Sequence, residues 1–225
     1  MQYELRGVHI ESVNEVADLG ILVGTDHYSN LNFSKHCVKI AKEASARSAL
    51  MFRAFSNRNI QFRLQLYKTF VRPKLEYASP AWNPYLKKDI NVLESVQRAF
   101  TLRLNSYQLQ GQYLQRLERF NLETLESRRL MIDLQYVYRI VHGLIDLDFN
   151  ELFTRSPRQT EGSECKIFLP GLKKNLNCRK YSFAIRTINV WNFLSKETRL
   201  ASSLDKKFET VTCRVFCFFK AVQDP

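Results

Sequence analysis

Several residues in this chain have side chains that could perform catalysis, but their spacing fits no known catalytic pattern. His9, His27, His36 and His142 stand apart, and no His-x-x-x-His pair occurs. His36 and Cys37 are adjacent, and because neighbouring side chains on a helix do not face each other, they cannot form a nucleophile and its base. The glycines form neither a GxGxxG nor a GxxxxGK phosphate loop, and no Gly-x-Ser-x-Gly turn is present. No reaction follows from these residues alone.

Groups that could bind a metal ion are also scattered. Cys213 and Cys217 are the only close cysteine pair, whereas a structural zinc site needs four ligands at close spacing. Cys165 and Cys178 are poor candidates to complete such a site, because they lie too far away in the sequence. No Asp-Asp pair supplies the clustered carboxylates of two-metal nucleotidyl transfer. We therefore expect no cofactor and no metal in this chain.

The net charge is the most informative property of the composition. The chain has 34 Lys and Arg against 22 Asp and Glu in 225 residues, a formal charge of +12. Such a balance favours an anionic partner, with nucleic acid first and an anionic membrane surface second. A basic protein without any polyanionic partner remains the alternative.

The positive charges gather on one predicted helix. From Leu31, apolar residues recur with helical spacing on one side: Phe33, Cys37, Ile40, Ala44, Leu50, Met51 and Phe55. On the opposite side, Lys35, Lys39, Lys42 and Arg53 fall within about 60° of one another. This pattern predicts either a nucleic-acid-binding face or a solvated lysine face.

Few glycines and prolines interrupt the chain, which indicates a mainly α fold with a small N-terminal antiparallel β element, an α+β class. We expect a hairpin around Gly7, a second β run over 13–23 with Asp18 opening a strand and Asp26 in a turn, and a strand over 166–169. One helix is predicted to begin at residue 31, a second to cover 60–77 with a break at Pro73, and a third to begin after Asp89 as its N-cap. Three more are predicted over 114–117, over 123–142 with Gly143 as the C-cap, and over 181–194. The organisation predicted is 1–30 (β), 31–153 (helical), 154–164 (flexible loop or linker) and 165–225 (basic C-terminal region).

The cell compartment follows from absences in the sequence. The start MQYELRGVHIES has neither the charged nor the apolar region of a secretory signal. No window approaches the ~18 apolar residues that span a membrane, and five scattered cysteines fit reduced thiols. We expect an intracellular protein of the nucleus or cytoplasm, neither secreted nor membrane-bound.

Six stretches resemble motifs of one family. They are Asp18–Val23 (DLGILV), Phe33–Cys37 with Lys39–Lys42 (FSKHC, KIAK), Tyr67–Tyr85 (YKTFVRPKLEYASPAWNPY), Leu93–Arg98 (LESVQR), Leu125–Leu130 (LESRRL) and Arg179–Phe183 with Ile188–Asn192 (RKYSF, INVWN). In this order they resemble the part of non-LTR retrotransposon (LINE, jockey-like) reverse transcriptases that follows the catalytic palm. The tail after Leu204 departs from the pattern.

The resemblance implies a fragment of an RNA-directed DNA polymerase. The family's catalytic aspartates lie upstream of the Asp18–Val23 stretch, so we expect no polymerase activity from this chain alone and Mg²⁺ only in the full-length polymerase. Residues 1–30 would be a remnant of the primer grip, with Leu19 and Gly20 in its hairpin, and 31–153 a thumb-like region that binds RNA, DNA or their hybrid through phosphates. The oligomeric state stays unknown.

The resemblance also suggests individual contacts with nucleic acid. Lys35, Lys39, Lys42 and Arg53 would contact phosphates without reading sequence, and Arg179 and Lys180 are a second basic candidate. Tyr67, Tyr77 and Trp82 could stack on bases, although packing in the core is the expected role of Tyr67 and an equal alternative for Trp82. Trp191 is expected in the core.

Three alternatives remain open at the level of the sequence. The chain could be part of a longer, active reverse transcriptase, a helical protein-interaction module without enzymatic activity, or a gene remnant without a stable product.

Overall fold

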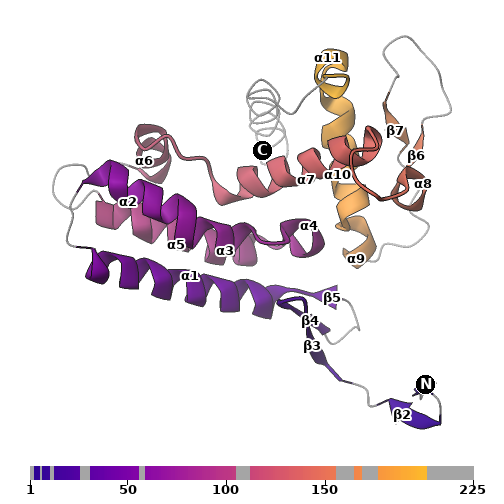
Figure 1. Ribbon diagram of the computed structural model, residues 1–225, viewed down its shortest axis with the longest axis horizontal. Coiled ribbons are helices and arrows are strands. Elements are labelled where there is room, and N and C mark those ends of the chain that lie inside the picture. Colours follow the sequence, from indigo (N-terminus) through magenta and orange to yellow (C-terminus); the bar gives the residue numbers. More distant parts are fainter. Residues whose placement is uncertain are drawn as a thin grey trace.

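The computed structural model describes residues 3–5, 7–10, 13–25, 31–55, 59–104, 112–155, 165–168 and 177–201. Within these ranges the fold is mainly α with a small N-terminal antiparallel β element, which confirms the predicted class (Figure 1). The strands are β1 (Tyr3–Leu5), β2 (Val8–Ile10), β3 (Glu15–Asp18), β4 (Ile21–Thr25), β5 (Leu31–Asn32), β6 (Thr154–Arg155) and β7 (Ile167–Phe168). The helices are α1 (Ser34–Ala54), α2 (Ile60–Leu66), the π-helix η1 (Tyr67–Val71), α3 (Arg72–Glu76), α4 (Ser79–Trp82), α5 (Lys87–Leu104), α6 (Tyr113–Arg119), α7 (Leu125–Val141), α8 (Phe149–Leu152), α9 (Asn177–Lys180), α10 (Phe183–Phe193) and α11 (Lys196–Arg199).

The N-terminal β element consists of two small sheets. β1 and β2 pair antiparallel around Gly7, whose φ of 80° is the positive value that the tight turn requires. β3 and β4 pair with Asp18 opposite Ile21, and β5 adds to the other edge of β4. The prediction that Asp18 opens a strand is wrong, because the turn falls at Leu19 and Gly20 and leaves Asp18 at the end of β3. Asp26 lies outside the described residues.

The helices form layers. α1 lies along one side of the molecule, η1, α3 and α5 pack over it, and α6 and α7 cover the opposite side (Figure 1). α10 packs against α7 at one end of this arrangement. Among the described helices, none combines the length and the apolar character that crossing a bilayer requires.

The buried side of α1 agrees with the predicted apolar side except at two positions. Leu50 is 57% exposed and Phe55 is 43% exposed, so the predicted apolar side is not buried at these two positions. Leu50 lies about 100° around the helix from the buried Met51, and Phe55 follows the last helical residue with an extended backbone. The buried residues of α1 are His36, Cys37, Ile40, Ala41, Ala44, Ser48 and Met51.

The proline at position 73 neither ends nor breaks the helical path. The π-helix immediately before it shifts the hydrogen bonds, so that the Arg72 N–H donates to the carbonyl of Tyr67, five residues earlier. Pro73 then stands in the first turn of α3, where its missing N–H costs least, and the path continues to Glu76. A π-helix thus replaces the predicted break.

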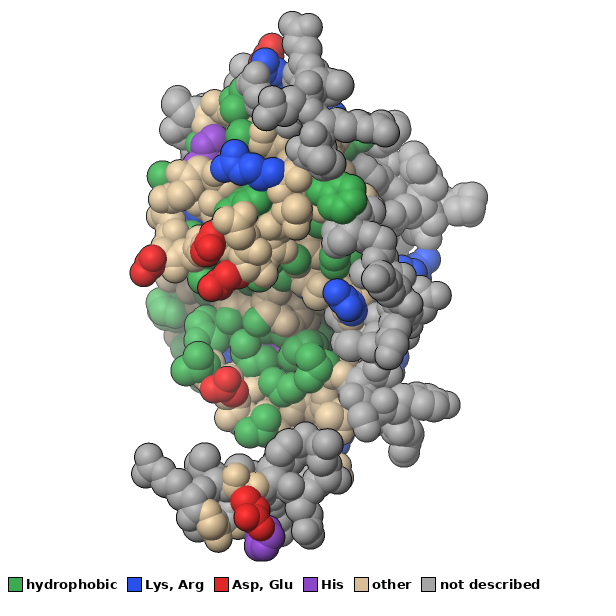
Figure 2. All heavy atoms as spheres, turned by 90° about the vertical axis from the view of Figure 1, so that its right-hand side faces the viewer, with side chains coloured by type: hydrophobic (Ala, Val, Ile, Leu, Met, Phe, Trp, Pro, Cys, Tyr) green, Lys and Arg blue, Asp and Glu red, His purple; other side chains and the backbone are tan. Residues whose placement is uncertain are grey.

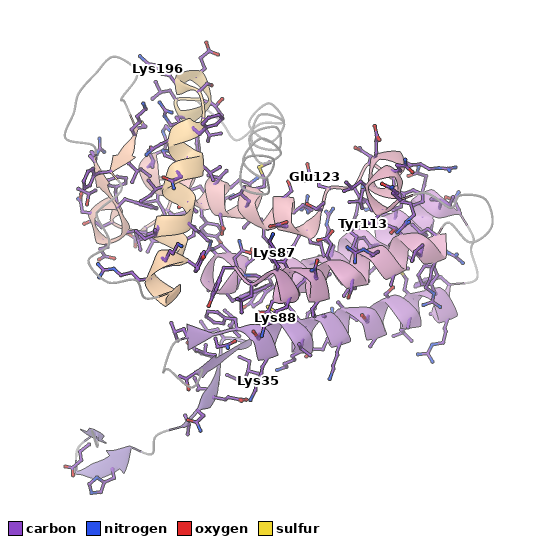
Figure 3. The ribbon with its side chains drawn as sticks, turned by 180° about the vertical axis from the view of Figure 1, so that it is seen from behind. Lys35, Lys87, Lys88, Tyr113, Glu123 and Lys196 are labelled. Atoms are coloured by element: carbon purple, nitrogen blue, oxygen red, sulfur yellow. The ribbon has the colours of Figure 1, made fainter. Side chains whose placement is uncertain are left out.

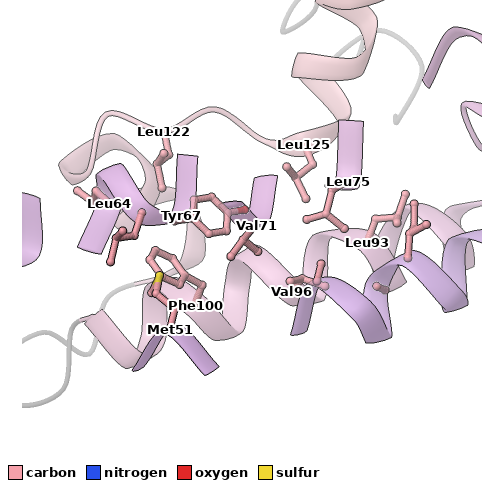
Figure 4. Close-up of a cluster of buried hydrophobic side chains, with 14 of the residues drawn as sticks. Met51, Leu64, Tyr67, Val71, Leu75, Leu93, Val96, Phe100, Leu122 and Leu125 are labelled. Atoms are coloured by element: carbon pink, nitrogen blue, oxygen red, sulfur yellow. The ribbon is translucent and has the colours of Figure 1, made fainter. Parts of the chain in front are cut away.

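Two hydrophobic clusters form the core. The first joins α1, α2, η1, α3, α5 and α6, and Tyr67 stacks on Phe100 at its centre with the ring centroids 4.3 Å apart (Figure 4). Burying the aromatic side chains and leucines shown there stabilises the fold by roughly 1.5–3 kcal/mol per side chain. The core role expected for Tyr67 is confirmed.

The second cluster lies between α7, β7 and α10. Trp191 is fully buried in it, as expected, and its indole N–H donates to the carbonyl of Cys165 at 2.8 Å. α7 ends as predicted, because Gly143 takes a φ of 63° and the Leu144 N–H returns to the carbonyl of Arg139 at 2.8 Å. The α7–α10 contact joins the regions predicted as 31–153 and 165–225, and these boundaries stay predictions.

The predicted loop 154–164 is only partly described. Its first two residues, Thr154 and Arg155, form β6 and pair with β7, so their assignment to a flexible loop is wrong. Residues 156–164 lie outside the described part of the chain, and so does the tail after residue 201.

Candidate nucleic-acid interface

The cationic side of α1 is exposed along the whole helix. Lys35, Lys39, Lys42 and Arg53 all face solvent, opposite the side that packs on α5. With a rise of 1.5 Å per residue, the distance from Lys35 to Arg53 along the axis is about 27 Å. The structure therefore brings together the four residues predicted from the sequence.

Acidic side chains balance only part of this charge. Lys35 forms an ion pair with Glu15 of β3. Glu43, on α1 itself, pairs with Lys74 of α3 at 2.7 Å. The hydrogen bond from Lys74 lowers the pKa of Glu43, and the nearby Lys39 and Arg47 lower it further, so Glu43 stays ionised and paired. Lys74 thereby offsets the negative charge of Glu43 on α1, a contact that was missed at the level of the sequence.

The N-terminal ends of α1 and α5 are tied together. The Ser34 hydroxyl donates to the buried Asp89 carboxylate at 2.6 Å. Asp89 was predicted as an N-cap, which is wrong, because α5 begins two residues earlier at Lys87 and Asp89 instead accepts from α1. As a result, Lys35 on α1 and Lys87 and Lys88 on α5 follow one another across one face (Figure 3).

A buried polar network holds α7 on α5. The Leu125 N–H, at the start of α7, donates to both carboxylate oxygens of Glu94, at 3.3 and 3.0 Å. The Tyr113 hydroxyl also donates to Glu94, and Gln97 bonds to Tyr67, Tyr113 and the Glu123 carbonyl. Burial raises the pKa of Glu94 above its usual range, although its hydrogen bonds oppose the shift.

A second network joins α3 to α7. Arg128 donates to both carboxylate oxygens of Glu76, and Arg72 lies 3.7 Å from the same carboxylate. Arg128 also approaches Glu123 at 3.8 Å. Arg72, Glu76 and Arg128 belong to the Tyr67–Tyr85 and Leu125–Leu130 motifs, so this part of both motifs stabilises the contact between the helices.

A third network reaches the C-terminal region. Asp133 is fully buried and accepts from Arg186 Nε and Nη2, each at 3.0 Å, and from Asn83 Nδ2 at 3.0 Å. Asn83 in turn accepts from Arg129 Nε at 3.0 Å. Arg186 also donates to the carbonyl of Pro80 at 2.8 Å. The two hydrophobic clusters are thus joined through buried ionic groups.

The remaining predicted residues lie apart from the α1 face. Trp82 is 1% exposed and its N–H donates to the Tyr77 carbonyl at 2.8 Å, so its ring belongs to the core and is closed to stacking on a base. Tyr77 is 59% exposed, and its hydroxyl donates to the Leu19 carbonyl at 3.3 Å. Leu19 and Gly20 form the tip of the β3–β4 hairpin, with φ of 45° and 85°. Arg179 and Lys180 are exposed on α9.

The structure brings together no catalytic or metal-binding group in the part of the chain that it describes. No cluster of three or more His, Cys, Asp and Glu residues occurs among the described residues. His36 is buried, and burial lowers its pKa, so its neutral ring accepts the Leu22 N–H at Nδ1 at 3.2 Å. Burial raises the pKa of the Cys37 thiol to about 12, which leaves it protonated and unreactive.

Comparison with known proteins gives one similarity. A stretch of 134 residues is 28% identical to "Uncharacterized protein B0403.1" of Caenorhabditis elegans, and the match covers 58% of this chain and 65% of that protein. The similarity thus spans just under two thirds of the relative's length. No family model matches the chain, and no solved structure matches it.

Proposed function

We propose that this chain binds nucleic acid, with an RNA–DNA hybrid duplex as the first candidate, through the exposed cationic side of α1 and without reading the base sequence. The observation that carries the proposal is the exposure of Lys39, Lys42 and Arg53 on one side of a helix whose other side is fixed in the core. The motif resemblance supports the proposal, because it implies a thumb-like region of a non-LTR reverse transcriptase, and such a region binds RNA, DNA or their hybrid. We assign no polymerase reaction to these 225 residues. We expect Mg²⁺ only in the full-length polymerase.

The physical reason is the release of counterions. A lysine or arginine that contacts a phosphate displaces condensed cations from the duplex. The affinity therefore rises with the number of such contacts, falls as salt is added and does not depend on the base sequence. The span of about 27 Å between Lys35 and Arg53 is close to the ~34 Å of one turn of a DNA duplex. Lys35 must break its ion pair with Glu15 before it can contact a phosphate, so it contributes less to the affinity than Lys39 and Lys42 do.

The test is fluorescence anisotropy with a labelled RNA–DNA hybrid at low and moderate salt. We expect sub-micromolar binding at low salt that weakens as salt is added. The double variant Lys39→Glu/Lys42→Glu should bind far more weakly, whereas Arg119→Glu/Arg139→Glu, which reverses two exposed charges on α6 and α7, should bind almost as the unaltered chain does. An unaltered chain that fails to bind at low salt refutes the proposal.

A second candidate is favoured by the exposure of the N-terminal sheet. Val16 is 52% exposed and Leu19 is 82% exposed on β3 and the following turn. Such an apolar surface favours a further segment that covers it, as a palm domain would in a longer, active reverse transcriptase. An open reading frame upstream of Met1 that encodes Tyr/Phe-x-Asp-Asp supports this candidate, and an upstream stop codon without it argues against it.

A further inference from the structure

Two tyrosines from distant parts of the sequence form a stacked pair at the surface. Tyr85 follows α4 and Tyr181 follows α9, yet their ring centroids are 4.1 Å apart and their planes differ by 1°. Tyr85 is still 38% exposed. Hydrophobic side chains gather on one face of the molecule, just above the N-terminal part of the chain (Figure 2).

The buried network fixes this pair in place. Arg186 donates to the Tyr181 carbonyl at 3.2 Å and to the Pro80 carbonyl at 2.8 Å, and it is itself held by Asp133. One partly buried guanidinium therefore links the backbone of Tyr181 to that of Pro80, five residues before Tyr85. A ring that is already positioned loses little conformational freedom when a ligand packs on it, which favours binding.

The surroundings of the pair are basic. Lys180 lies over the Tyr181 ring with Nζ 5.3 Å from the centroid, and Arg179 precedes it. Lys87 and Lys88 begin α5 two and three residues after Tyr85. No acidic residue occurs between Tyr77 and Lys88 or between Asn177 and Ser195, so the charged side chains on these two segments are positive. Asp89 and Asp133, which reach this region from α5 and α7, are buried and bonded to Ser34 and to Arg186.

Tyr85 also forms one wall of a small surface pocket. Its other walls include Leu31, Phe33, Pro84 and Leu86, with the Ser34–Asp89 hydrogen bond at one side. An apolar wall beside an aromatic ring suits the flat face of a base and its sugar, while the flanking lysines suit the phosphates.

We propose that the Tyr85–Tyr181 pair is a stacking platform for a single-stranded base, flanked by phosphate contacts to Lys87, Lys88 and Lys180. The inference rests on the proposed function, since it extends nucleic-acid binding from the α1 side to a second surface. It names single-stranded nucleic acid, such as the unpaired end of a hybrid, as the ligand of this surface. An acidic protein segment would match the charge but offers no ring to stack.

The experiment compares two labelled probes, a blunt RNA–DNA hybrid and the same hybrid with a short single-stranded DNA extension that contains 2-aminopurine. Tyr85→Ala should weaken binding of the extended probe by about 5- to 150-fold, the range measured for losing a stacked base, and leave the blunt probe unchanged. Tyr85→Phe keeps the ring and should bind the extended probe as the unaltered chain does. The matched control is Tyr136→Ala, because Tyr136 is 39% exposed and also lies beside an arginine, Arg139, but on α7.

Two further measurements are independent of the variants. Binding of the unaltered chain should quench the 2-aminopurine fluorescence through stacking, and oligoglutamate should compete poorly with the extended probe. The inference is overturned if the fluorescence does not change, if oligoglutamate competes as well per charge as DNA, or if Tyr85→Ala behaves like Tyr136→Ala. Salt-dependent binding of the blunt hybrid combined with any of these results leaves the proposed function standing, whereas no binding of either probe refutes both.

Discussion

Replacing Asp133 with Asn tests whether the buried ion pair holds the two hydrophobic clusters together. Asp133 is fully buried, and Arg186, whose side chain is 16% exposed, donates to it twice. Breaking a buried pair from one side costs about 3–5 kcal/mol, because the remaining charge is left without compensation. Arg186 keeps its bonds to the Pro80 and Tyr181 carbonyls, so we expect the lower end, about 3 kcal/mol.

The assay is urea denaturation, supported by thermal unfolding. A loss of about 3 kcal/mol corresponds to a fall in Tm of about 6–12 °C for a chain of this size. The control is Glu15→Gln, which breaks the exposed Lys35–Glu15 pair and should cost no more than about 1 kcal/mol. The double variant Asp133→Leu/Arg186→Met removes both charges and should be more stable than Asp133→Asn. If Asp133→Asn loses no more than Glu15→Gln, the pair does not hold the clusters together.

Three other predictions concern stability and reactivity. Glu94→Gln should gain stability relative to the unaltered chain as the pH rises from about 4 to 7. Burial raises the pKa of Glu94, so the unfolded chain releases this proton at a lower pH than the folded chain does, and the unaltered chain loses stability over this range. The prediction is contradicted if the free energy of unfolding of Glu94→Gln minus that of the unaltered chain falls or stays constant over this range. Gly143→Ala should lower the free energy of unfolding by about 1–2 kcal/mol, because φ is 63° and no atom lies near the added Cβ, so only the backbone is strained. An unchanged urea midpoint would be inconsistent with that geometry. Cys37 should resist alkylation near pH 8 in the folded protein and react in urea, because it is buried and burial raises its pKa to about 12. If mass spectrometry finds Cys37 modified without urea, the thiol is accessible and the prediction is wrong.

The elements that depend on local sequence were the ones that could be predicted. Gly7 and Gly143 supply the positive φ of a hairpin and of a helix end, and both signals depend only on neighbouring residues. The cationic side of α1 follows from helical periodicity in the same way. The predictions failed where a turn or helix end altered the local geometry, as at Asp18 and Asp89, or where a π-helix absorbed Pro73.

Contacts between distant residues could not be predicted from one sequence. Glu94 meets the start of α7 at Leu125, and Asp133 meets Arg186, only after the helices have packed. One signal was present, since Gln97 lies about 40° from Leu93 around α5 and thus interrupts the apolar side with a polar residue. Several motif residues quoted for the family resemblance, such as Glu76 and Asn83, prove to be buried or half-buried members of these networks. Their contacts stabilise the fold.

The central claim is that α1 contacts phosphates, and the salt dependence of hybrid binding tests it most directly. Anisotropy titrations over a series of salt concentrations give the slope of log K against log salt. Four contacts predict a slope of about −3 to −4 for the unaltered chain, and Lys39→Glu/Lys42→Glu should reduce its magnitude by about 2. An equal slope for the variant and the unaltered chain would contradict the claim, because the charges of α1 would then take no part in binding.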